Sequence, residues 1–131
     1  MSVDTIGDFL TIIRNGIMAS KPYVLAPHSK VRLEIAKILE NEGFIREFSV
    51  VDDDKIKTKL KIVLKYVNGE SVIHDIHRVS TPGRRNYVGK DSIRPVIDGL
   101  GVSILTTSKG FVTGNKAKEL DVGGEVVCTV W

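Results

Sequence analysis

The sequence predicts an α+β protein of two small domains: an N-terminal α/β domain with its elements in the order αβαββ, and a C-terminal, mainly β domain with a short helix. Three observations lead there. Two early segments repeat apolar residues at helical spacing, a long segment then alternates lysine with apolar residues, and the remainder consists of short apolar runs between glycine-rich turns. The turn pair Asn68-Gly69 marks the change, which predicts domains at 1–68 and 69–131.

Two helices are expected in the first domain. The segment DTIGDFLTIIRNGIMAS has an apolar stripe, with Asp4 or Thr5 placed to cap its start and with Arg14 and Asn15 off the stripe. A short run, YVLA, separates it from PHSKVRLEIAKILENEGF, whose stripe and whose stop at Gly43 predict a second helix.

A long strand with one lysine face is expected next. In residues 55–67 (KIKTKLKIVLKYV), Ile56, Leu60, Ile62, Leu64 and Tyr66 fall on one face and Lys55, Lys57, Lys59, Lys61 and Lys65 on the other. The acidic turn before it predicts a hairpin with a strand at 45–51. The lysines are compatible with a solvated, aggregation-resistant face and also with a face that meets RNA or a neighbouring protein.

The second domain is expected to hold short strands. SVIHDIHRVS is strand-like, STPGRRNY is a loop, and SIRPVIDG forms at most a short helix because Pro95 lies within it. A strand VSILT, a polar turn, a short helix around NKAKEL and a closing strand at 125–131 complete the chain.

Composition narrows the class of protein. A net charge of +3 with a pI near 9.0 makes nucleic acid a candidate partner. The single cysteine, Cys128, cannot form an internal disulfide, which fits a reducing compartment. No apolar stretch reaches the ~20 residues of a membrane helix, and no secretion signal is visible. We therefore expect a soluble, cytoplasmic protein without a membrane partner.

Catalytic and metal sites are not indicated, so we expect no enzyme, no cofactor and no metal. His74 and His77 would point to opposite faces of a strand and could not share an ion, and Cys128 has no activating base in its pattern. The order TTSKG also differs from a phosphate-binding P-loop, in which the glycines precede the lysine and a helix follows.

Two loops carry side chains that favour RNA as a partner. Residues 80–87 (the arginine loop) combine Arg84 and Arg85, which can hold phosphates, with Tyr87, which can stack on a base. Residues 106–110 (the hydroxyl turn) supply hydroxyls and a lysine that can meet 2′-hydroxyls, phosphates and base edges. Each loop alone could equally be an ordinary surface turn.

Nearly the whole chain, from DTIGDFLTIIRN to the terminal tryptophan, resembles the bacterial-type ribosomal proteins numbered eight of the small subunit. KVRLEIAKILENEGFI, STPGRRNY and GLGVSILTTSKGFVTGNKAKELDVGGEVVCTVW carry the resemblance. Two positions depart from the family pattern: Thr106 stands where the family has serine, and Asp98 where it has asparagine.

The resemblance implies a function in binding without chemistry. The expected partner is the central domain of small-subunit rRNA, which the family binds early in assembly at an irregular helix with a distorted internal loop. Some bacterial members also bind a similar structure in their own operon's mRNA and repress its translation. A free monomer, a cytoplasmic location in the small subunit and neighbouring ribosomal proteins, small-subunit protein five among them, are also expected; an organelle-encoded origin stays open.

The family's RNA-binding positions fall on Thr106, Thr107, Ser108, Lys109 and Gly110, with Tyr87 and Glu125 nearby. Glu125 could accept from a base amine, orient the hydroxyl turn or serve structure alone. Further candidates in the first domain are Thr5, Arg14, Asn15 and Lys30, where helix starts and polar faces can meet phosphate. The rival hypothesis is a protein-interaction module that uses the lysine face.

Overall fold

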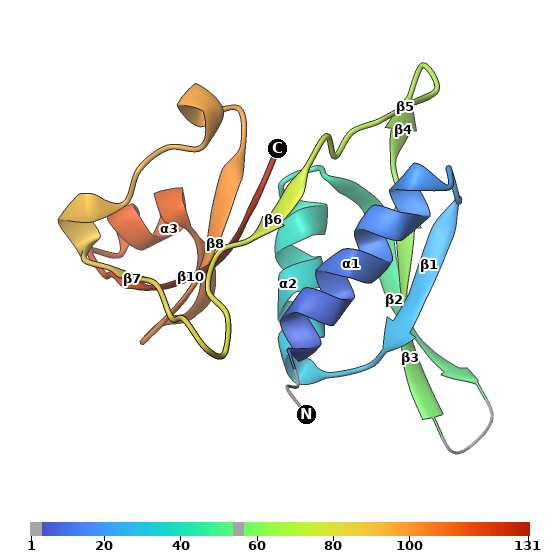
Figure 1. Cartoon of the computed structure of the whole chain (residues 1–131), viewed down its shortest axis with the longest axis horizontal. Coiled ribbons are helices and arrows are strands. Elements are labelled where there is room, and N and C mark those ends of the chain that lie inside the picture. Colours follow the sequence, from blue (N-terminus) through green and yellow to red (C-terminus); the bar gives the residue numbers. More distant parts are fainter. Residues whose placement is uncertain (1–3, 54–56) are drawn as a thin grey trace. The chain divides into compact units, whose positions relative to one another are not determined.

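A computed structural model describes residues 4–53 and 57–131. It is α+β, as predicted, and its contacts divide the chain into two compact units (Figure 1). One unit is Thr5–His74, and the other is Asp75–Trp131 together with Asp4. Among the described residues, no helix has the length and apolar character needed to cross a membrane.

The first unit places two helices on one face of a three-stranded antiparallel sheet, whose strand order is β1-β3-β2 (Figure 1). Its elements are α1 (Thr5–Met18), β1 (Tyr23–Pro27), α2 (Lys30–Asn41), β2 (Ile45–Asp53) and β3 (Lys57–Leu64). The αβαββ order matches the prediction. The Ser29 side chain caps α2 by accepting the N–H of Arg32, and Gly43 follows the helix with a φ of 82°.

The expected alternation of β3 is present where the strand is described. Leu60, Ile62 and Leu64 are buried under the helices, with Phe9, Ile13, Ile35 and Leu39. Lys59 and Lys61 lie on the opposite face. Lys55 and Ile56, which belong to the predicted lysine strand, lie outside the described residues.

The Asn68-Gly69 pair forms the turn of a small hairpin between β4 (Tyr66–Val67) and β5 (Glu70–Ser71). Both turn residues have positive φ, 53° and 78°, as a type I′ hairpin turn requires. This hairpin belongs to the first unit, so the division between the units comes after His74 rather than after Asn68.

The second unit is built around its last strand, β10 (Gly124–Val130). The sheet order is β6-β10-β8-β9, and β7 also pairs with β10 (Figure 1). The other strands are β6 (Ile76–Arg78), β7 (Tyr87–Val88), β8 (Val102–Thr107) and β9 (Gly110–Thr113). The segment 71–80 is therefore less strand-like than predicted, with only Ile76–Arg78 paired to β10.

The helix α3 (Gly114–Glu119) covers one face of this sheet, where Ile93, Leu105 and Ala117 form the core. Thr113 caps α3 by accepting the N–H of Lys116. Around Pro95 only two short 3-10 turns form, Lys90–Ser92 and Ile97–Gly99, as the proline predicts.

Candidate nucleic-acid interface

The centre of the candidate interface is one row of residues across three strands. Glu125 of β10 lies opposite Tyr87 of β7 on one side and opposite Thr106 of β8 on the other. Residues paired in this way point to the same face of a sheet. The row therefore brings the arginine loop and the hydroxyl turn, far apart in sequence, to one face.

The hydroxyl turn is a tight hairpin between β8 and β9, with Ser108 and Lys109 at its tip. Thr107 closes it: its Oγ1 accepts the N–H of Lys109 at 3.0 Å and donates to the carbonyl of Gly110 at 3.0 Å. Gly110 has a φ of 97°, a conformation that side-chain-bearing residues rarely adopt. The tip side chains are exposed, and neither has a hydrogen-bond partner within the described part of the chain.

Glu125 holds the arginine loop against β10. The Oε2 atom of Glu125 accepts a hydrogen bond from Arg85 Nη1 at 3.0 Å and another from the hydroxyl of Ser80. Burial alone would raise the pKa of Glu125, but the hydrogen bonds from Ser80 and Arg85 and the charge of Arg85 outweigh it, so the pKa of Glu125 is lowered. The same hydrogen bond raises the pKa of Arg85. Glu125 is thus an ionised anchor for the loop.

Three residues that the sequence did not indicate complete this anchor. The fully buried Ser80 accepts the backbone N–H of Asn86 at 3.0 Å, and the Asn86 side chain donates to the carbonyl of Val79 at 3.0 Å. Arg78 donates to the carbonyl of Val127 at 2.9 Å and pairs with Asp4 at 3.2 Å. Only the strand register reveals them, because a serine and an asparagine in a loop carry no signal of burial.

Close backbone packing holds the row together. A Cβ on Gly124 would lie 2.3 Å from the carbonyl oxygen of Thr106, and one on Gly123 would lie 2.3 Å from that of Val88. Only glycine fits at either position without displacing the strands. The Gly123-Gly124 pair therefore sets how near β7 and β8 come to β10.

The face exposes groups suited to RNA. Tyr87 keeps 71% of its surface exposed, and the two loops also expose Arg84, Arg85, Ser108 and Lys109. An exposed ring can stack on a base, cations can hold phosphates, and hydroxyls can meet 2′-hydroxyls. Arg84 sits on a short bridge with Thr81, which fixes the bend of the arginine loop.

The candidates in the first unit fall into two groups. Thr5 and Lys30 are the first residues of α1 and α2, and both are exposed. Buried Arg32 ties these helix starts together, since it donates to the carbonyl of Thr5 at 2.9 Å and to that of Pro27 at 2.8 Å. Arg14 and Asn15 lie about 14 Å further along α1, so they cannot share a contact with Thr5.

The residue before α1 is Asp4, which is therefore at the N-cap position, while Thr5 is already helical. Both Asp4 oxygens accept hydrogen bonds from Arg78, at 3.2 and 3.3 Å. Of the two residues proposed to cap the helix, Asp4 and not Thr5 is therefore at the cap position. Asp4 also carries an ion pair within the second unit.

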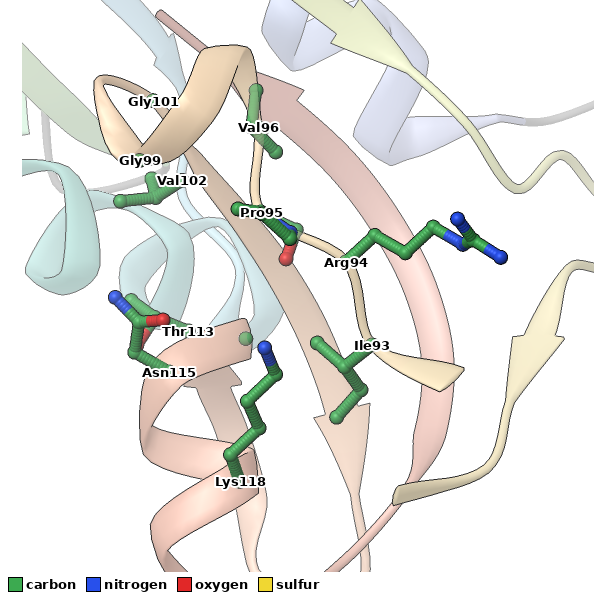
Figure 2. Close-up of a pocket in the computed structure, with 12 residues that line it drawn as sticks. Ile93, Arg94, Pro95, Val96, Gly99, Gly101, Val102, Thr113, Asn115 and Lys118 are labelled. Carbon is green, nitrogen blue, oxygen red and sulfur yellow. The ribbon is translucent and has the colours of Figure 1, made fainter. Parts of the chain in front are cut away.

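A small pocket lies between the 93–101 loop and the start of α3 (Figure 2), and none of its lining residues belongs to the row described above. Its free volume of about 20 Å³ holds about one water molecule, too little for a nucleotide. Arg94 extends away from the pocket, whereas Lys118 and Asn115 line it from the helix (Figure 2). The described residues also contain no group of three or more histidine, cysteine, aspartate or glutamate side chains able to hold a metal.

Comparison with known proteins gives a match along nearly the full chain. The model of the family described as Ribosomal protein S8 matches residues 4–131. The small ribosomal subunit protein uS8 of Rhizobium etli (strain CIAT 652) is 50% identical over 128 residues, which cover 98% of this chain and 97% of that protein. The uS8 protein of Thermosipho africanus is 49% identical over 132 residues, covering 98% of each chain. The chain therefore belongs to the ribosomal protein S8 family, whose members are structural proteins of the ribosome and not enzymes.

Proposed function

We propose that this chain is a structural component of the small ribosomal subunit and binds the central domain of small-subunit rRNA, where it promotes assembly. Membership of the S8 family supports the ribosomal role. The row of Tyr87, Glu125 and Thr106 supports the RNA contact, because it joins two loops of complementary chemistry on one exposed face.

In this proposal the cations and the hydroxyls have different roles in RNA binding. Arg84, Arg85 and Lys109 hold the phosphate backbone, which gives affinity without sequence information. Ser108 and Tyr87 read the distorted shape through hydrogen bonding and stacking. Thr107 acts by positioning, since its hydroxyl already donates and accepts within the turn.

Glu125 is proposed to orient the arginine loop rather than to touch a base. Its carboxylate is engaged by Ser80 and Arg85, and a carboxylate repels phosphate. The candidates in the first unit, Thr5, Arg14, Asn15 and Lys30, are proposed as secondary contacts to the backbone.

The same face would recognise a similar hairpin in the mRNA of the chain's own operon, and repression of translation is the regulatory role proposed with it. We also propose a cytoplasmic location within the subunit and a contact with small-subunit protein five. We assign no additional residues to these roles.

Hydroxyl-radical footprinting of a central-domain transcript, with and without the protein, tests the proposal. Protection is expected at an irregular helix with a distorted internal loop and should disappear on competition with that helix alone. Protection spread evenly over the transcript would contradict it. An association with ribosomal proteins that resists both salt and ribonuclease would support the rival protein-interaction module.

A further inference from the structure

Within the described part of the first unit, both helices pack on one face of the three-stranded sheet, and no helix of that unit covers the other face. The strand register places alternate residues of each strand on this open face. They are Tyr23 and Leu25 of β1, Lys59, Lys61 and Val63 of β3, and Glu47, Ser49 and Val51 of β2. Tyr23 and Leu25 each keep 44% of their surface exposed. The face therefore combines apolar groups with two lysines and one exposed glutamate, Glu47.

The basic and apolar groups meet in a shallow hollow lined by Tyr23, Leu25, Val51, Lys59 and Lys61. The ammonium of Lys61 lies 4.5 Å from the centroid of the Tyr23 ring, which fixes both side chains at the hollow. Within the described residues, neither Lys59 nor Lys61 forms an ion pair. Two positive charges beside an exposed ring are thus available to a partner.

We propose that this open sheet face is a second RNA-binding surface, which takes an unpaired RNA segment with a phosphate at Lys59 and Lys61 and a base against Tyr23 and Leu25. Lysine is a common phosphate binder, and stacking of bases on aromatic side chains is sequence-tolerant. Lysine is depleted in the cores of protein–protein interfaces, so this composition favours RNA over a protein partner.

The surface differs from the proposed rRNA interface in both place and selectivity. It lies in the unit Thr5–His74 and shares no residue with the arginine loop or the hydroxyl turn. Its groups contact phosphates and ring faces rather than base edges, so it binds without strong sequence preference. A variant that no longer binds RNA at one surface can therefore still be tested for binding at the other.

An NMR titration of the full-length, ¹⁵N-labelled chain with octauridylate tests the surface residue by residue. Amide shifts are expected at Tyr23, Leu25, Lys59 and Lys61. Lys59→Gln/Lys61→Gln should weaken binding at least fivefold and lower the salt slope by about 1.4, which is about 0.7 for each phosphate contact on a single strand. Tyr23→Leu should weaken binding about threefold and leave the slope unchanged.

Lys37→Gln is the matched control, because it removes one exposed lysine charge from α2 in the same unit. It should change binding by less than twofold, whereas Lys61→Gln alone should exceed threefold. Ser108→Ala should leave octauridylate binding unchanged, which separates this surface from the hydroxyl turn. Circular dichroism confirms that each variant is folded.

Three results would overturn the proposal. Amide shifts absent from the sheet face would show that the oligonucleotide binds elsewhere or does not bind. Equal weakening by Lys37→Gln and Lys61→Gln would reduce the effect to net charge. Tighter binding of a glutamate-rich decapeptide than of octauridylate at the same amides would assign the face to an acidic protein segment.

Discussion

The hydroxyl of Ser80, which has no exposed surface, donates a hydrogen bond to the carboxylate of Glu125. Its oxygen also accepts the N–H of Asn86, so one buried side chain ties the two ends of the arginine loop to β10. The loop that presents Arg84 and Arg85 is therefore held by a small polar network rather than by apolar packing.

Ser80→Ala should lower the free energy of unfolding by about 2 kcal/mol, because it leaves a buried N–H and a carboxylate without their partner. Urea unfolding of the full chain measures this. Ser49→Ala, on the exposed face of the other unit, is the control and should cost less than about 0.5 kcal/mol. Equal stability of the two variants would remove Ser80 from the anchor.

Glu125→Gln should reduce the dependence of stability on pH at the acidic end. The pKa of Glu125 is lower in the folded chain than in the unfolded one, so its contribution is present above the unfolded value of about 4.3 and is lost as pH falls through the folded value. Near pH 7 the free energy of unfolding of the variant should be lower than that of the unaltered chain. This difference in free energy should disappear below about pH 4. Urea unfolding from pH 3 to 7 measures it, and a gap that stays constant with pH would contradict the ionised anchor.

Ser108→Ala should weaken binding to the irregular rRNA hairpin by about 1–2 kcal/mol and leave binding to a regular duplex of the same length unchanged. The reason is that Ser108 sits at the exposed tip, where its hydroxyl is available to the RNA. Filter binding to both RNAs measures the difference. Equal losses for the two would show that the hydroxyl turn does not read shape.

Lys109→Ala should lower the slope of log affinity against log salt by about one unit, since one phosphate contact is removed. Affinities at several salt concentrations give the slope. Lys116→Ala, on α3, serves as the control and should leave it unchanged. An unaltered slope for Lys109→Ala would exclude a phosphate contact at this lysine.

Cys128 should resist thiol reagents in the folded chain. Burial raises the pKa of its thiol to about 12, and only the thiolate reacts. Iodoacetamide at pH 8 should label less than a tenth of the native chains in the time that fully labels the unfolded chain, as followed by mass spectrometry. Rapid native labelling would show that β10 opens readily.

Local patterns were enough to predict most of the fold. Helical spacing gave α1 and α2, and alternation gave β3 with Leu60 and Ile62 buried. The segment 71–80 was less regular than expected because a strand exists only where a partner pairs with it, and β10 pairs with Ile76–Arg78 alone in that stretch. Pairing partners far along the chain cannot be read from local periodicity.

The sequence identified the exposed candidate residues, whose binding role stays a prediction, but it did not identify the residues that support them. Ser108, Lys109 and Arg85 could be named as candidate RNA contacts, because a hydroxyl or a cation in a turn is visible from the residue type. Ser80 and Asn86 were missed because their role depends on burial and on the register of β10. Glu125 was left between three roles, and its hydrogen bonds favour the structural one.

The central place of β10 has a consequence for synthesis. Tyr87 and Thr106 are neighbours only through this strand of seven residues, which follows every other element described in the sequence. A growing chain that already contains both loops has no surface on which to align them. We therefore expect that a nascent or prematurely ended chain does not present the proposed RNA-binding face.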